Sequence, residues 1–218
     1  MTIEPTRDQT PFARLRQFVE PTSAAERCEL CAREIGPTHD HLLEPGVRHV
    51  VCACGACAVL FSDTSDLRYK RIPRESRSLP GFRLTDGQWE SLRLPIELAF
   101  IYRSSTQDRI VAAYPSPAGP TKSALTLDTW EDIERANPVL TTMRDDVEAL
   151  LVNRVGHTRA ATTGEYYIAP IDQCYALVGI IRANWSGLSG GTTVWGEITR
   201  FFAELASRST PVSEVTNA

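Results

Sequence analysis

Short apolar runs bounded by polar or turn-forming residues predict several β-strands in this chain. Residues 95–102 and 109–114 are two such runs, and the polar segment between them predicts a β-hairpin. The same kind of short apolar or alternating pattern recurs at residues 58–61, 67–72, 122–127 and 166–169. We therefore expect a sheet built from several strands.

Apolar residues spaced by three and four positions predict helices in other segments. This spacing occurs at residues 12–19, from Asp128 to Glu134, at residues 174–183 and from Val194 to Leu205. Together the strands and helices predict an α+β fold with a mixed sheet.

Polar caps predict two more short helices. Thr85 or Asp86 precedes Trp89 and Leu92, and Asp145 or Asp146 precedes an apolar segment that includes Leu150. An acidic pair at a helix start is what the helix dipole favours, so we assign Asp145 and Asp146 no catalytic role.

Five of the six cysteines and three of the four histidines lie between Cys28 and Cys57, and two of these histidines form the pair His39-x-His41. Two Cys-x-x-Cys pairs, Cys28/Cys31 and Cys54/Cys57, each bring two sulfurs onto one tight turn, as a tetrahedral metal ion requires. Gly55 would supply a positive φ in the second turn. The 22 residues that separate the pairs slightly exceed the usual spacing of about 15–20. This pattern predicts a zinc-ribbon-like metal knuckle with these four ligands.

Three further residues are alternative ligands. Cys52 could replace Cys54 or Cys57 as a ligand if residues 52–54 are extended, because the side chains of Cys52 and Cys54 then point to the same side of the strand. His39 or His41 could also be a metal ligand. Otherwise the two histidines donate hydrogen bonds to the sulfurs from outside the coordination shell, or they belong to a surface turn with no role.

Four thiolates suit zinc, and they also suit a rubredoxin-like iron site. Rubredoxin-like knuckles usually carry glycine after the second cysteine, whereas Ala32 and Ala58 occupy those positions here. Zinc is therefore the favoured ion and iron the alternative. A zinc ion with four thiolate ligands has no open position, so we expect it to be structural.

Charge and hydropathy argue against two classes of protein, those that bind nucleic acids and those that span a membrane. The net charge of −4 lacks the basic footprint of a nucleic-acid-binding protein, and no apolar run is long enough to span a membrane. Residues 1–10 lack an apolar signal region, so we expect a reducing cytoplasmic location, where clustered thiols bind metals more often than they form disulfides.

We divide the chain into a disordered start (1–10), a helix with the cysteine-rich module (11–64), an α+β domain (65–206) and a disordered tail (207–218).

Three other features have a less specific meaning. A basic patch is either a solvated strand face or a docking site for an acidic partner; it consists of Arg68, Lys70, Arg71, Arg74 and Arg77. Cys174 lies within an apolar helix, where a cysteine is usually a core residue. The glycine-rich segment 185–191 precedes the last helix and is a connecting loop or an anion site.

The chain resembles a family of bacterial proteins of unassigned function in several blocks. The blocks are Cys28-x-x-Cys31, His39-x-His41, Cys52-x-Cys54-x-x-Cys57 with Leu60-Phe61, and residues 114–119, 146–154, 170–175 and 185–191. Members of that family are typically encoded beside nickel–iron uptake hydrogenases of the oxygen-tolerant, high-affinity kind. The resemblance covers about residues 11–206 and implies an accessory of hydrogenase assembly or a protein attached to the hydrogenase.

Three hypotheses follow. The first is a zinc-stabilised binding protein that docks a hydrogenase subunit or maturation protein. The second is an electron-transfer protein with a cysteine-ligated iron. The third is an enzyme that uses Cys174 beside the 185–191 loop, although the sequence contains no Ser-His-Asp, HExxH, Rossmann or phosphate-loop signature.

Overall fold

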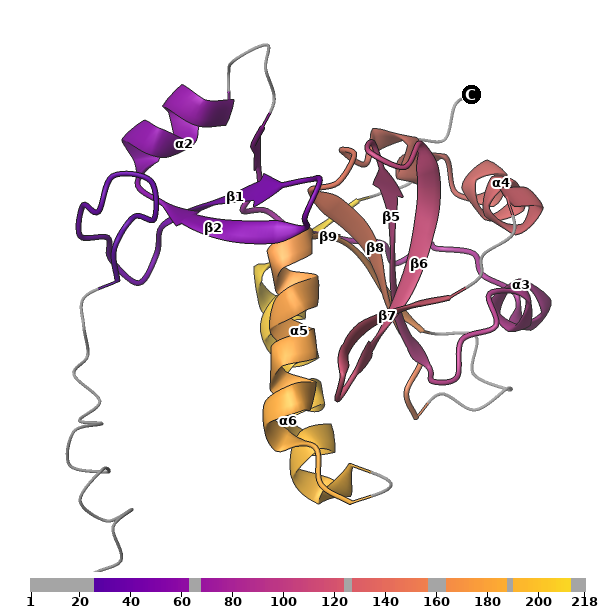
Figure 1. Ribbon diagram of the computed structural model, residues 1–218. Helices are drawn as coiled ribbons and strands as arrows, with labels where there is room; N and C mark the ends of the chain where they lie inside the picture. Colours follow the sequence, from indigo (N-terminus) through magenta and orange to yellow (C-terminus); the bar gives the residue numbers. More distant parts are fainter. Residues whose placement is uncertain (1–25, 63–67, 124–126, 157–163, 188–189, 213–218) are drawn as a thin grey trace, which may run out of the picture.

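The computed structural model describes residues 26–62, 68–123, 127–156, 164–187 and 190–212. In these ranges the chain forms a small cysteine-rich module and a larger body, each with its own sheet (Figure 1). The α+β class is confirmed. The helix predicted at 12–19 lies outside the described residues.

Seven strands form the sheet of the body. Their order is β10 (Thr210–Pro211), β4 (Arg77–Ser78), β9 (Glu165–Pro170), β8 (Glu148–Asn153), β5 (Leu98–Ser104), β6 (Arg109–Ser116) and β7 (Gly119–Ser123). All neighbouring strands are antiparallel except β10 and β4. The predicted hairpin is confirmed as β5–β6. The tail was predicted to be disordered over residues 207–218; its described part continues as helix to Arg208 and then forms β10, and residues 213–218 lie outside the described residues.

Helices cover both faces of this sheet (Figure 1). One face packs against α5 (Ile171–Asn184) and α6 (Gly191–Arg208). The other packs against α3 (Asp86–Ser91), α4 (Leu127–Ala136) and the 3₁₀ helix η1 (Pro138–Thr142). Thr85 caps α3 as predicted, in a capping box with Gln88.

Strand β8 corrects one prediction. Residues 148–153 form a central strand, not a helix capped by Asp145 or Asp146. Ala149 and Leu151 point to the α5–α6 side, while Leu150 and Val152 point to the α3–α4 side. A strand buried on both faces is apolar at nearly every position, so its pattern does not separate it from a helix.

The cysteine module comprises residues 26–62 and the short strand β3 (Lys70–Arg71). Its sheet has the order β2 (His49–Ala53), β1 (Asp40–Glu44), β3, and β2 leads into helix α2 (Gly55–Ser62). Residues 58–61, predicted as a strand, belong to α2. A short continuous apolar run such as residues 58–61 is compatible with either a strand or a helix.

Apolar and polar contacts join the module to the body. Leu43 and Ile72 belong to the same buried cluster as the inner residues of α5 and α6. Arg48 extends from the β1–β2 turn, donates from Nε to the Tyr175 hydroxyl at 3.0 Å and lies over the Tyr102 ring.

Asp146 is the central charge of this junction and is fully buried. It accepts hydrogen bonds from Lys70 Nζ at 2.6 Å and from the Ser105 backbone N–H at 3.1 Å. Burial by itself would raise the pKa of Asp146, but the bonds from Lys70 and Ser105 outweigh it and lower the pKa. Asp146 therefore holds β3, part of the module, against the body.

Candidate metal centre

The first cysteine pair lies on a tight knuckle at the start of the module. The Cys28 N–H donates to the Arg33 carbonyl at 2.7 Å, and the Ala32 N–H donates to the Cys28 carbonyl at 2.8 Å. Ala32 has a φ of 59°, so it adopts the left-handed conformation that glycine usually takes after the second cysteine. This turn brings the Cys28 and Cys31 side chains together.

The second pair lies at the start of a helix and not on a second knuckle. Cys54 immediately precedes α2, Cys57 is in its first turn, and the Ala58 N–H donates to the Cys54 carbonyl at 2.9 Å. Gly55 is part of this helix and does not supply the predicted positive φ. The order knuckle, hairpin, helix therefore differs from the predicted zinc-ribbon arrangement.

The hairpin brings the two pairs into register. Glu29, inside the knuckle, donates its N–H to the Cys52 carbonyl at 2.9 Å and accepts from the Cys52 N–H through Oε1 at 2.7 Å. These two bonds fix the knuckle against the end of β2, three residues before α2 begins at Gly55. The start of α2 consequently faces the knuckle.

The four sulfurs of Cys28, Cys31, Cys54 and Cys57 all lie within 4.8 Å of one another, and this group could hold a metal ion. The Cys31 and Cys54 sulfurs are 3.8 Å apart. Two thiolates on a tetrahedral ion, each about 2.3 Å from the metal, are about 3.8 Å apart. Cys28, Cys54 and Cys57 are buried and Cys31 is exposed.

The electrostatics of the cluster favour a cation at its centre. Burial opposes ionisation of Cys28, but backbone N–H groups, the strongest from Cys54, donate to its sulfur and lower its pKa to about 6. The Cys57 backbone N–H lowers the pKa of Cys54. Burial, together with the neighbouring sulfurs, raises the pKa of Cys57 to about 12. One thiol ionises readily, and its negative charge opposes ionisation of the neighbouring thiols. Four thiolates together therefore require a positive ion between them.

The three alternative ligands lie apart from this cluster. His39, His41 and Cys52 form a second group whose ligand atoms are within 4.8 Å of one another. Asp172, at the start of α5, accepts a hydrogen bond from His41 Nδ1 at 2.6 Å. The sequence did not indicate that Asp172 contacts His41, because 131 positions separate the two residues.

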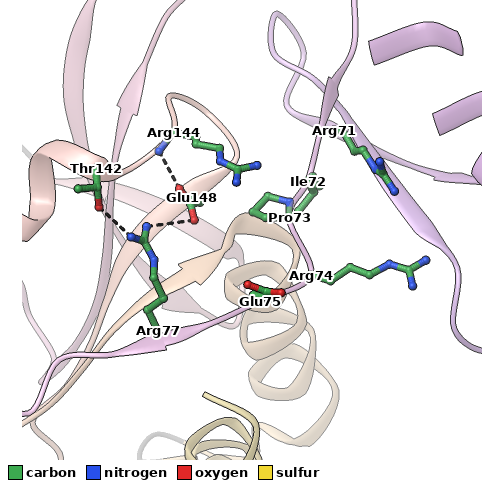
Figure 2. Close-up of a pocket in the computed structure, with 9 residues that line it drawn as sticks. All are labelled: Arg71, Ile72, Pro73, Arg74, Glu75, Arg77, Thr142, Arg144 and Glu148. Carbon is green, nitrogen blue, oxygen red and sulfur yellow. Dashed lines mark hydrogen bonds and ion pairs between the residues drawn. The ribbon is translucent and has the colours of Figure 1, made fainter. Parts of the chain in front are cut away.

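The predicted basic patch is largely paired with acids. Arg71 and Arg74 contact Asp40, Arg68 contacts Glu44, and Lys70 contacts Asp146. A polar cleft of about 430 Å³ lies beside β3, and in it Arg77 bridges Thr142 and Glu148 (Figure 2). The patch is therefore a set of ion pairs and not a uniformly positive surface, and its Lys70–Asp146 pair joins the module to the body.

Cys174 faces the interior of the body from α5 and is fully buried. Burial raises its pKa well above the usual range of a thiol, which is the opposite of the environment of a reactive cysteine. The 185–191 loop lies partly outside the described residues; in its described part the Ser186 N–H donates to the Gly190 carbonyl at 3.1 Å.

A family model described as a family of unknown function, DUF5947, matches residues 27–209. The chain belongs to this family. No curated protein and no solved structure matches it. The matched range of this DUF5947 chain includes both ligand groups and the body except for β10. Among the described residues, no helix is long and apolar enough to cross a membrane.

Proposed function

We propose that this protein is a zinc-stabilised binding protein that docks onto a subunit or a maturation protein of a nickel–iron hydrogenase. The observation that carries the proposal is the arrangement of the four sulfurs, which come from the knuckle and from the start of α2 and lie within 4.8 Å of one another. Four protein ligands complete the tetrahedron of a zinc ion and leave it no vacancy for a substrate. Such an ion stabilises the fold of the module, and the protein would then act by binding a partner and not by catalysis.

Helix α2 offers a surface for that contact. Val59 and Leu60 are 57% and 64% exposed, and Phe61 is exposed beside them. The helix carries no charged residue and lies on the side of the module away from the body (Figure 1). Adjacent exposed apolar side chains are typical of protein interaction sites. Because Cys54 and Cys57 fix the start of α2, the zinc ion would present this surface.

The choice of a hydrogenase component as partner rests on the sequence resemblance. The resemblance includes Leu60-Phe61 immediately after the cysteine pair as well as the cysteines themselves. A partner that recognises α2 would therefore contact the same sequence block that contains the metal ligands Cys54 and Cys57.

Copurification from the native host tests this function. We expect the tagged protein to capture hydrogenase subunits or maturation proteins, and Leu60→Glu to reduce the capture at least about tenfold, or about 1.4 kcal/mol. The matched control is Val47→Glu, because Val47 is similarly exposed but lies in the β1–β2 turn. Normal hydrogenase maturation and activity in a deletion strain would contradict the proposal.

The iron alternative makes a different prediction for the same sample. A rubredoxin-like site would be coloured, contain iron and have a reversible potential, whereas the zinc form is colourless and redox-silent. The N–H groups that donate to the Cys28 sulfur would stabilise either thiolate complex. The helical position of Cys54 and Cys57, in place of a second knuckle, favours zinc.

A further inference from the structure

We propose that His39, His41 and Cys52 form a second metal site, separate from the four-cysteine centre, for a divalent transition metal such as zinc. This site would have three protein ligands and one open position. It goes beyond the proposed binding function, which needs only the closed four-cysteine site.

The sheet places the three side chains on one surface. His41 lies directly opposite Cys52 in the antiparallel β1–β2 pair, so their side chains project from the same face. His39 precedes His41 by two positions, and its ring packs edge-on against that of His41, with 4.8 Å between centroids. The three ligand atoms lie within 4.8 Å of one another.

Hydrogen bonds on the outer nitrogens orient both imidazoles. His39 Nδ1 lies 2.9 Å from the Gly36 carbonyl and 3.4 Å from Glu26 Oε2, and His41 Nδ1 lies 2.6 Å from Asp172 Oδ2. A carbonyl and an ionised carboxylate only accept, so both Nδ1 atoms must donate. The lone pairs of the neutral rings are consequently on the two Nε2 atoms.

Those two Nε2 atoms face each other at 3.1 Å. Two lone pairs at this distance repel unless a positive species lies between them. Nitrogen ligands on a tetrahedral ion, each about 2.05 Å from the metal, are about 3.3 Å apart, which is close to the observed spacing. A proton shared by the two rings would also relieve the repulsion, but it would give Cys52 no part in the cluster.

The ligand types define the class of metal. Two imidazoles and one thiolate suit zinc and its neighbours in the first transition row and do not suit magnesium or calcium. The Asp172–His41 contact has the form of a carboxylate–histidine–metal arrangement, in which the carboxylate fixes the ring and strengthens the ligand. Asp172 is thus a positioning residue, supplied by the body to a site in the module.

Partial exposure separates this site from the four-cysteine centre. The His41 side chain is 29% exposed and Cys52 is only half-buried, so water or a partner's side chain can reach a fourth position. With three protein ligands, the ion would be held less tightly and exchange more readily than an ion with four thiolates. The site is therefore suited to an exchangeable metal.

Cobalt titration of the intact protein tests the proposal, after it has been loaded with one zinc ion per chain so that the second site is free of zinc. Zinc remains at the four thiolates because it binds such sites more tightly than cobalt does. We expect one further Co²⁺ per chain, with tetrahedral d–d absorption and a thiolate charge-transfer band from a single sulfur. Cys52→Ala should remove that band, and His39→Ala should weaken binding at least about tenfold.

Two further variants make the test specific. Asp172→Asn should lower the affinity about 10–100-fold while the spectrum of the saturated site remains that of one thiolate and two imidazoles. His49 is on the same strand as Cys52 but is exposed, so His49→Ala should leave Co²⁺ binding unchanged. The zinc content of each variant reports whether the four-cysteine centre is intact, so a failed second site is distinguishable from a failed module.

Two results would overturn the proposal. The first is that the zinc-loaded protein binds no further Co²⁺ at concentrations that saturate ordinary three-ligand sites. The second is that Co²⁺ binds equally well in Cys52→Ala and His39→Ala. In the first case, a proton shared by His39 and His41 would explain their spacing.

Discussion

The body and the cysteine module are stabilised in different ways. The body buries one apolar cluster on each face of its seven-stranded sheet. The module's own cluster contains only seven buried residues, and three of these are the cysteines Cys28, Cys54 and Cys57. A unit of about 40 residues cannot usually fold on apolar burial alone and needs a metal or disulfides. An ion in the module would therefore replace the core that the body builds from side chains.

The module also differs internally. Its hairpin shares Leu43 with the core of the body, and Arg48 and His41 bond to body residues. Among the described residues, the buried side chains of the knuckle and α2 belong to the module's own cluster and not to the core of the body. This difference predicts which part of the module depends on the ion.

Removal of the metal should have the largest effect. Structural zinc sites contribute about 10–16 kcal/mol of binding free energy to folding. We expect a strong chelator, or Cys28→Ser, to unfold residues 27–35 and α2 while β5, β8 and β9 stay folded. Hydrogen exchange followed by mass spectrometry measures this directly, and continued protection of α2 without metal would break the distinction between the two regions.

The junction between the regions should be the next most sensitive place. Asp146→Asn leaves Lys70 and Arg48 without their buried charge partner, so we expect a loss of about 4 kcal/mol in unfolding free energy. Asparagine tolerates the φ of 70° at this position, so the substitution tests the charge. Asp145→Asn is the control and should change stability by less than about 0.5 kcal/mol, since Asp145 is partly exposed and its ion pair with Arg103 is long, at 3.8 Å.

Acid should reproduce the effect of Asp146→Asn in the natural chain. Because the pKa of Asp146 is lowered in the folded protein, its contribution is complete above the pKa of an unfolded aspartate. It is lost as the pH falls through the lower folded pKa. Urea denaturation between pH 6 and pH 2 should therefore show a steeper acid loss in the natural chain than in Asp146→Asn, and parallel curves would contradict this assignment.

Damage to the body core should leave the metal in place. Leu150 is almost fully buried in β8 under α4, and Leu150→Ala should cost about 3 kcal/mol. At a temperature where the variant is still folded, its zinc content should equal that of the natural chain. Leu60→Ala, at an exposed position of α2, is the control and should change the body's melting temperature very little.

Cys174→Ala should have the smallest effect. This thiol is a buried core group, so we expect a loss of about 1 kcal/mol with unchanged metal content and partner capture. Loss of function in a folded Cys174→Ala protein would instead support the enzymatic hypothesis.

Local sequence signals predicted the parts of the structure that local chemistry determines. Cys-x-x-Cys spacing identified the four clustered cysteines, and the cap at Thr85 and the β5–β6 hairpin follow from short patterns. Nearby residues set each of these features, so one stretch of sequence contains the whole signal.

The features that the sequence did not reveal depend on distant contacts. Strand β8 is apolar on both sides because two helical layers cover it, and this cannot be seen within residues 148–153 alone. The Asp172–His41 contact and the burial of Asp146 arise only when the module packs on the body. The separation of His39, His41 and Cys52 from the four-cysteine cluster likewise follows from the hairpin register.

Native mass spectrometry of the purified protein tests the central claim most directly. After dialysis against a weak chelator, we expect one tightly held zinc ion in the natural chain. That ion should be absent from Cys57→Ser and present in Cys52→Ser and Cys174→Ser. Four reduced, metal-free thiols in protein purified with zinc present, or the same zinc in Cys57→Ser, would contradict it.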